Sequence, residues 1–157
     1  MATRRHTETA VSAPSEQMTR DEITALFARR QVAYDDLDAV ALSADYAEDA
    51  AIDSPLSGSH GKADAARSLQ AVFDAFLDLK MTFEPPIIDG NRVCAFATAE
   101  GTNIGGLMGL PPSGRSFRMK TAFFYELAAG KIVREHRIYD FTGLLVQVGV
   151  LKAKPAC

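Results

Sequence analysis

The clearest pattern in the chain is a helical repeat of apolar residues over residues 62–79. Apolar positions there recur every three or four residues, which places them on one face of an α-helix. They are Ala65, Ala66, Leu69, Val72, Phe73, Phe76 and Leu77. Thr19 and Glu22 have the spacing of a capping box, so an earlier helix is expected to begin near Arg20. A shorter helical piece over residues 37–46 begins in an acidic cluster, which suits the positive end of a helix dipole.

The second half of the chain alternates apolar and polar residues, which is typical of β-strands. Gly90, Gly130 and a glycine-rich stretch between them separate the strands, as antiparallel connections require. The expected strands lie within residues 81–90, 91–103, 115–130 and 131–141, after a short strand that ends at Asp53. Residues 142–151 predict a terminal helical turn. Three helical pieces packed on an antiparallel sheet of four or more strands indicate an α+β fold.

Length and composition fit one domain. A chain of 157 residues with 47% hydrophobic residues can bury a core without disulfides or metals. Residues 1–18 are polar and aperiodic, so a flexible tail is expected there, followed by a domain over residues 19–152 and a short tail over residues 153–157. The net charge of -3 argues against a nucleic-acid partner, because nucleic-acid affinity depends on clustered positive charge.

The chain also shows no sign of export or membrane insertion. Arg4 and Arg5 resemble a twin-arginine signal, but residues 6–14 lack the apolar segment that such a signal needs. No run approaches the roughly 18 apolar residues of a membrane span. Cys94 and Cys157 form neither a metal motif nor a disulfide framework, which favours a reducing compartment. We therefore expect a cytoplasmic protein.

The hairpin formed by the last two strands is expected to carry the functional residues. If Ala129 and Gly130 form a two-residue turn, Ala128 faces Lys131, and alternate side chains share a face. One face then carries apolar residues beside charged ones, and unpaired charges buried there need a partner or a hydrated pocket. Its members are Phe117, Met119, Thr121, Phe123, Tyr125, Leu127, Ile132, Arg134, His136, Ile138 and Asp140. The opposite face, which includes Glu135, Arg137 and Tyr139, is expected to meet solvent or a second subunit.

Three of the polar candidates allow two interpretations each. Asp140 and His136 lie about 13 Å apart along a strand, too far for a direct pair. Asp140 either has a functional role in the site or caps a helix that begins at Thr142 or Gly143. His136 is either catalytic or a hydrogen-bonded core or rim residue. Asp53 either faces a cup between helices and sheet or initiates a turn before Pro55.

Other motifs are excluded or left open. The three histidines, His6, His60 and His136, lack metal-ligand spacing, and no glycine motif for a nucleotide is present. The loop over residues 104–113 is either a lid or an ordinary hairpin connection. Its apolar members Leu107, Met108 and Leu110 are expected to contact the pocket or a second subunit.

Several segments together resemble a known family. Residues 109–115 read GLPPSGR, a Gly-Lys-Ile turn follows at residues 130–132, and D-x-x-G-L-L-x-Q-x-G spans residues 140–149. With YAEDAAIDSPLSGSHGKADAARSL at residues 46–69, they resemble the SnoaL-like polyketide cyclases (ester cyclases) of the nuclear transport factor 2-like superfamily, over residues 23–150. The resemblance implies a cone-shaped, curved antiparallel sheet wrapped around N-terminal helices, an enclosed apolar pocket and a homodimer.

The resemblance also implies a chemistry. In the polyketide cyclases of this family an aspartate on the last strand is the general acid/base of an intramolecular aldol condensation, with neither metal nor organic cofactor. By motif position that aspartate is Asp140, and desolvation by Phe117, Met119 and Ile138 would raise the pKa of its carboxyl group from about 3.9. His136 or Arg134 would hydrogen-bond a substrate oxygen.

We therefore expect a cofactor-independent cyclase or isomerase, whose site combines catalytic and binding residues around a hydrophobic polyketide-like or polycyclic carbonyl compound. Asp140 and His136 are the expected catalytic residues. The expected substrate contacts are Asp53, Phe117, Met119, Phe123, Tyr125, Arg134 and Ile138. Two alternatives stay open: epoxide opening by water with Asp53 and Asp140, and a non-catalytic binding or assembly module in which Asp140 only caps backbone amides.

Overall fold

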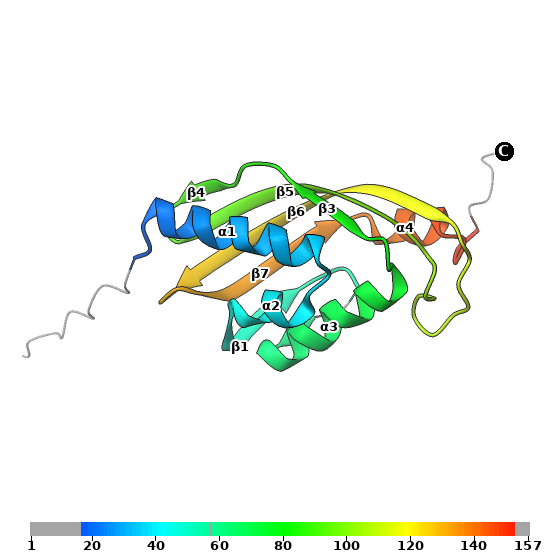
Figure 1. Ribbon diagram of the computed structural model, residues 1–157, viewed down its shortest axis with the longest axis horizontal. Coiled ribbons are helices and arrows are strands. Elements are labelled where there is room, and N and C mark those ends of the chain that lie inside the picture. The colour runs from blue at the N-terminus through cyan, green and yellow to red at the C-terminus, as the bar shows by residue number, and fades with distance from the viewer. Residues whose placement is uncertain (1–16, 57, 153–157) are drawn as a thin grey trace, which may run out of the picture.

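The computed structural model describes residues 17–56 and 58–152 (Figure 1). Residues 1–16 of the expected N-terminal tail and all of the expected tail over residues 153–157 lie outside the described residues. Met18, the last residue of that N-terminal segment, belongs to the fold. Its backbone amide donates a hydrogen bond to Oδ1 of Asn91 at 3.0 Å, and its side chain packs against the core.

The expected helices are present. They are α1 (Arg20–Asp35), α2 (Ala39–Ala44), α3 (Lys62–Ala75) and α4 (Phe141–Gln147). The capping box predicted for the first helix is confirmed, because the Thr19 hydroxyl accepts from the Glu22 amide and the Glu22 carboxylate accepts from the Thr19 amide. Helix α3 ends four residues earlier than its pattern predicts, but Phe76 and Leu79 beyond it are still buried.

One curved sheet carries the rest of the fold. The strands are β1 (Tyr46–Asp53), β2 (Ser59–His60), β3 (Lys80–Phe83), β4 (Ile87–Asp89), β5 (Arg92–Thr102), β6 (Ser116–Ala128) and β7 (Lys131–Tyr139). Their order is β2-β1-β7-β6-β5-β3, with β4 beside β5. All pairs are antiparallel except β1 with β7, which run parallel because a long crossover joins them.

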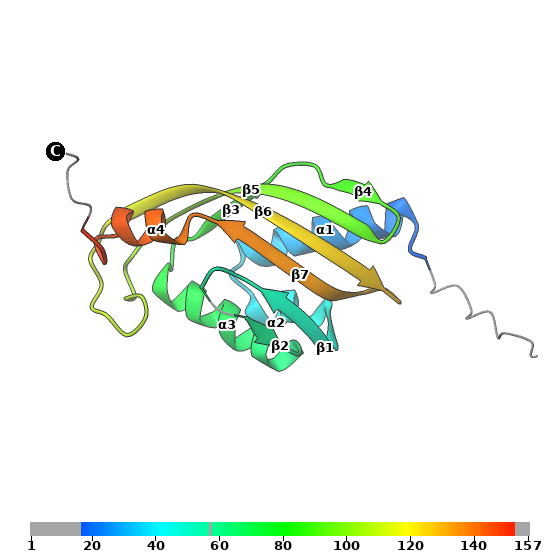
Figure 2. The same ribbon diagram turned by 180° about the vertical axis from the view of Figure 1, so that it is seen from behind.

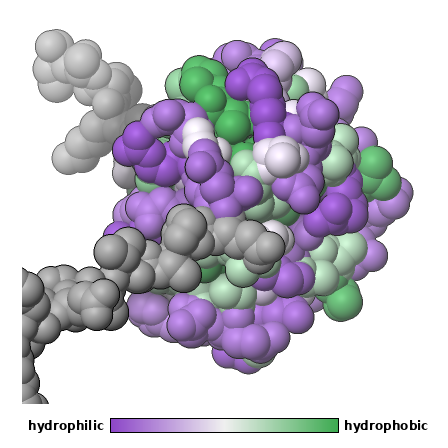
Figure 3. All heavy atoms as spheres, turned by 90° about the vertical axis from the view of Figure 1, so that its left-hand side faces the viewer, coloured by the Kyte–Doolittle hydropathy of each residue, from purple (hydrophilic) through white to green (hydrophobic). Residues whose placement is uncertain are grey.

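The expected α+β architecture is confirmed: helices α1, α2 and α3 lie on one side of the sheet, which curves around them without closing (Figures 1 and 2). The core fills the space between these layers and includes Ile23 of α1, Phe73 of α3 and Val93 of β5. At the end of the molecule near the start of α1 the surface is mostly hydrophilic (Figure 3). Within the described ranges, no helix is long and apolar enough to cross a membrane.

The register of the β6–β7 hairpin differs from the expectation. Ala128 faces Lys131 as predicted, but a bulge then shifts the pairing, so that Glu126 faces Arg134 and Tyr125 faces Glu135. An extra residue in one strand sends every later side chain to the opposite face.

The prediction that Arg134, His136, Ile138 and Asp140 share a face with Phe117 and Met119 is therefore wrong. The first three stay together, but on the outer face of the sheet, where Ile138 is 68% exposed. Asp140 follows the end of β7 and is the N-cap of α4. Glu135, Arg137 and Tyr139 take the inner positions instead.

Candidate functional site

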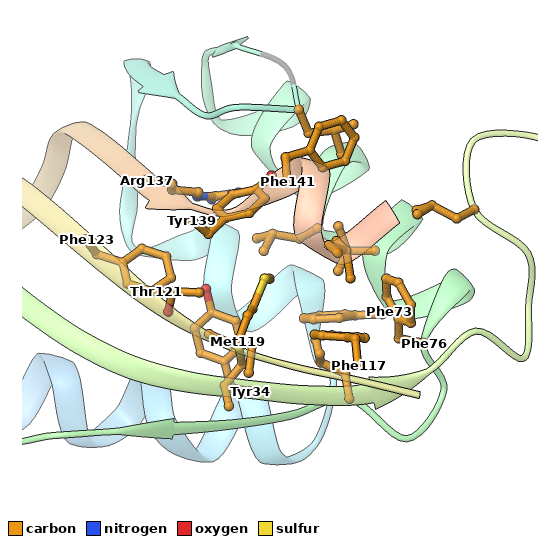
Figure 4. Close-up of a pocket in the computed structure, with 18 residues that line it drawn as sticks. Tyr34, Phe73, Phe76, Phe117, Met119, Thr121, Phe123, Arg137, Tyr139 and Phe141 are labelled. Carbon is orange, nitrogen blue, oxygen red and sulfur yellow. The ribbon is translucent and has the colours of Figure 1, made fainter. Parts of the chain in front are cut away.

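A cavity of about 100 Å³ lies between α3 and the concave face of the sheet (Figure 4). We call it the α3 cavity. Phe73, Phe76 and Phe117 gather toward one end of it, whereas Phe123 and Arg137 lie toward the other. Its walls are mostly apolar, as expected of a site for a hydrophobic guest.

The volume limits what the enclosed part can hold. An engineered cavity of roughly 150 Å³ binds benzene, so about 100 Å³ holds no more than a single ring. The lining residues Leu56, Val72 and Phe141 are partly exposed, so the α3 cavity reaches the surface beside them. A polycyclic guest would have one ring inside and the rest in this mouth.

Four lining residues are polar. They are Tyr34 at the end of α1, Thr121 of β6, and Arg137 and Tyr139 of β7. Thr121 and Tyr139 are cross-strand partners, and the Thr121 hydroxyl donates to the Ala97 carbonyl at 3.3 Å. Arg137 is the one charged residue in the described lining, and its side chain is 13% exposed. The polar groups are therefore concentrated on adjacent inner positions of two strands.

Arg137 is held by a buried network behind the cavity wall. Its Nε donates to Oε1 of Glu135 at 2.5 Å, and its Nη2 donates to the Tyr46 hydroxyl at 3.4 Å. The Tyr46 hydroxyl donates a short hydrogen bond to Oε2 of Glu135 and accepts from Nη2 of Arg30 at 3.2 Å. Arg30 continues the network to Asp45 at 3.4 Å. Glu135 and Arg30 are both buried, so the chain fixes these charges inside the protein.

The network sets the protonation of its members. Burial alone would raise the pKa of Glu135, but the charge and hydrogen bond of Arg137, aided by Arg30 and Tyr46, lower that pKa below its usual value. Burial would lower the pKa of Arg137, yet the Glu135 carboxylate holds it well above its usual value. Burial, followed by the Glu135 charge, raises the pKa of Tyr46. Glu135 is thus an anion at neutral pH, and Tyr46 is a protonated donor.

Tyr125, an expected substrate contact, lies elsewhere. It is fully buried, packs edge-on against Phe27, and lines a second cavity of about 260 Å³ beside α1 rather than the α3 cavity. Within the described part of the chain, its hydroxyl is the one fully buried side-chain polar atom without a hydrogen-bond partner. Burial raises its pKa well above the usual value, so the hydroxyl stays protonated.

The structure divides the other expected substrate contacts into two groups. Phe117, Met119 and Phe123 line the α3 cavity. Arg134 and Ile138 are exposed on the outer face of the sheet. Arg134 and Ile138 do share one face of β7, as the alternation predicts, but the bulge places that face on the outside of the sheet.

Asp53 and His136 are brought together, but outside the α3 cavity. They are partners across the parallel β1–β7 pair, and Nδ1 of His136 lies 3.0 Å from Oδ2 of Asp53. The Asp53 side chain is 71% exposed and that of His136 is 37% exposed. This pair therefore meets solvent on the outer face.

Asp140 caps helix α4, which is one of the two roles that the sequence allowed for it. Its Oδ1 accepts from the Gly143 amide at 2.7 Å, which makes it the N-cap of α4. The residue is exposed and does not line the α3 cavity, although Tyr139 and Phe141 on either side of it do. The apolar surroundings expected from Phe117 and Met119 are absent around this carboxylate in the described conformation.

The glycine-rich loop contributes one wall of the α3 cavity. Leu107 is buried and lines it, as expected, whereas Met108 and Leu110 are exposed. The Gly105 amide donates to the Ala75 carbonyl at 3.0 Å, which fixes the loop to the end of α3. A Cβ atom on Gly105 would lie 1.7 Å from the Asp74 carbonyl oxygen, so only glycine fits there.

Sequence reasoning missed the polar part of the site. Arg137, Tyr139 and Glu135 were placed on the opposite face, and Tyr34 and Tyr46 carried no expected role. The alternation of opposite charges at Glu135 and Arg137 was the available signal, because residues two apart on a strand share a face and can pair. No group of three or more His, Cys, Asp or Glu side chains suited to a metal ion occurs in the ranges that the structure covers.

Comparison with known proteins agrees with this fold. The model of the SnoaL-like polyketide cyclase family matches residues 25–148. No curated protein matches the sequence. Among solved structures, AclR of Streptomyces galilaeus, provisionally assigned as a hydroxylase, is 23% identical with a TM-score of 0.75, and the match covers 87% of each chain.

Two provisionally assigned polyketide cyclases are also similar. IdmH of Streptomyces antibioticus is 27% identical with a TM-score of 0.65, covering 82% of this chain and 96% of IdmH. A protein of Xanthomonas campestris pv. campestris is 27% identical with a TM-score of 0.71, covering 82% of this chain and 98% of its own.

Proposed function

Since this chain belongs to the SnoaL-like polyketide cyclase family, we propose that it binds a hydrophobic, polyketide-like carbonyl compound in the α3 cavity and cyclises it by proton transfer. One observation carries the proposal: an apolar cavity has three of its four polar lining residues, Arg137, Thr121 and Tyr139, on adjacent inner positions of β6 and β7. The similarity to IdmH and to the Xanthomonas protein supports the same reaction class.

The cavity suits the charge that such a reaction develops. A ring of the guest packs against Phe73, Phe117 and Met119, and its carbonyl oxygen accepts a hydrogen bond from Arg137. Removal of an α-proton places negative charge on that oxygen. Donors fixed beforehand in a site with little water stabilise this charge more than water does. The enolate carbon then attacks a second carbonyl of the same molecule, and the resulting alkoxide takes up a proton.

Asp140 is the acid/base of this proposal by its place in the D-x-x-G-L-L pattern. To reach a guest, its carboxylate must leave the Gly143 amide. His136 and Asp53 pair with each other on the outer face, so the geometry lends no support to epoxide opening with Asp53. A homodimer and a cytoplasmic location stay predictions.

A second candidate function follows from the bond between Asp140 and Gly143. If Asp140 serves only as a helix cap, the α3 cavity binds its guest without catalysis. The two functions share the cavity and differ in whether Asp140 moves protons.

Two measurements with 2-acetylnaphthalene, a neutral aromatic ketone, separate them. Calorimetry measures binding, and proton NMR in D₂O follows loss of the methyl signal, which reports enolisation. We expect binding, and exchange faster than in buffer. Asp140→Asn should keep binding and lose exchange, because asparagine also caps helices.

Ala99→Leu fills the cavity and should abolish both binding and proton exchange. Ala122→Leu, on the other face of the sheet, should change neither. Binding without exchange in the unaltered protein would favour the non-catalytic function. Undiminished binding in Ala99→Leu would refute the assignment of the α3 cavity.

A further inference from the structure

The network linked to Arg137 contains more arginines than carboxylates. The ion pairs and hydrogen bonds of the network join three arginines to two carboxylates, since Arg29 also contacts Asp45 at 2.5 Å. The arginines are Arg29, Arg30 and Arg137, and the carboxylates are Asp45 and Glu135. Among the described residues the buried part of the network is neutral, because Arg30 and Arg137 balance Asp45 and Glu135, and the third arginine, Arg29, is mostly exposed.

Only Arg137 brings a charge of this network to the wall of the α3 cavity. Arg137 lines the cavity, whereas Arg30 borders the second cavity beside α1 and the side chain of Arg29 is 60% exposed. No Asp or Glu belongs to the described lining of the α3 cavity. A negatively charged guest would meet a guanidinium there and no competing carboxylate.

The guanidinium also has donor capacity left. Nε and Nη2 of Arg137 are bonded to Glu135 and Tyr46, but Nη1 has no partner among the described residues. Among the described residues, only the Tyr125 hydroxyl is both fully buried and without a partner. Nη1 of Arg137, which also lacks a partner, is therefore not fully buried. The Tyr139 hydroxyl-bearing side chain stands two residues along the same face, about 7 Å away at the backbone. The Tyr139 hydroxyl lies 3.5 Å from Oγ of Ser54, so Nη1 of Arg137 is the donor available to a carboxylate oxygen.

We propose that the guest of the α3 cavity carries an anionic oxygen, as a carboxylate or an ionised enol, on an apolar ring, and that Arg137 selects it. This inference rests on the proposed function and narrows its substrate class from carbonyl compounds to acidic ones. Glu135 is a positioning residue here: its carboxylate binds Nε of Arg137 and leaves Nη1 of the guanidinium for the guest. A charge-assisted hydrogen bond in a partly buried site is stronger than its neutral counterpart.

A matched pair of probes tests the selection. The probes are 2-naphthoate, which is anionic at pH 7.5, and 2-acetylnaphthalene, which has nearly the same shape and no charge. Calorimetry should show that the unaltered protein binds 2-naphthoate at least tenfold more tightly. Arg137→Met should weaken the binding of 2-naphthoate at least tenfold more than that of the ketone and so remove this preference.

Two further variants serve as controls, one for destabilisation by an unpaired Glu135 and one for the loss of an arginine elsewhere on the strand. Because Arg137→Met leaves Glu135 without its counterion and can destabilise the protein, the double variant Arg137→Met/Glu135→Gln removes both charges and should show the same loss of preference. Arg134→Met, on the outer face of the same strand, should keep the preference.

The outcomes are distinguishable. Equal affinities for the two probes in the unaltered protein, or a preference that survives in both Arg137 variants, would overturn the selection by Arg137. If the ketone still binds and Ala99→Leu still blocks it, the proposed function stands without this inference. If neither probe binds, both fail.

Discussion

Replacing Glu135 by glutamine tests the buried network that positions Arg137. The glutamate side chain is fully buried and accepts hydrogen bonds from Arg137 and Tyr46. Glutamine keeps the size of the side chain but removes its charge, so the Arg137 guanidinium loses its nearest counterion. Removing one partner of a buried ion pair costs about 3–5 kcal/mol, and we expect a loss of that size in the free energy of unfolding at pH 7.

The same substitution predicts a pH dependence. The pKa of Glu135 in the folded protein lies below the ordinary value of 4.5, so its stabilising contribution is complete above that value. The contribution is lost as the pH falls through the folded-state pKa. The stability difference between the unaltered protein and Glu135→Gln should therefore be largest at neutral pH and shrink below pH 4.5.

Urea unfolding followed by circular dichroism from pH 3 to pH 7 measures this difference directly. Glu100→Gln is the matched control, because Glu100 pairs with Arg118 on the surface at 2.5 Å and should change stability by less than about 1 kcal/mol. A loss below about 1 kcal/mol for Glu135→Gln at pH 7, or a loss that does not vary with pH, would refute the reasoning.

Three further substitutions test other parts of the account by thermal or urea unfolding. Asp140→Ala should destabilise the protein by about 0.5–2 kcal/mol because it removes the bond to the Gly143 amide, and an equal loss in Asp140→Asn would contradict the cap. Gly105→Ala should cost about 1–3 kcal/mol because its Cβ meets the backbone of α3, so unchanged stability would contradict the loop packing. Asp53→Asn should cost less than about 1 kcal/mol and leave the affinity for 2-acetylnaphthalene within twofold, since its pair with His136 is exposed; a tenfold weaker affinity would place the pair in the site.

Local signals predicted the fold well. The capping box at Thr19 and the apolar stripe of α3 depend only on neighbours in the sequence, and both were found, although the helix ends at Ala75 and Leu77, expected in the stripe, is exposed. The strands of the second half were recognisable for the same reason. The parallel pairing of β1 with β7 was not, because it depends on how a long crossover returns to the sheet.

The site was predicted less completely because it depends on one bulge. Phe117, Met119 and Phe123 belong to β6, whose alternation is unbroken because the extra residue of the bulge is on β7, and they line the cavity as the pattern suggested. Beyond the bulge, Arg137 occupies the position expected for His136. The extra residue leaves no mark in the periodicity, and only the energetic cost of burying unpaired charges indicated that some partner had to exist.

The most direct test of the central claim is a crystal structure of the protein with 2-acetylnaphthalene bound. We expect one naphthalene ring among Phe73, Phe117 and Met119, with the ketone oxygen within hydrogen-bond distance of Arg137. A ligand found only on the outer face beside His136 and Ile138, or an α3 cavity that stays empty at saturating ligand, would contradict it.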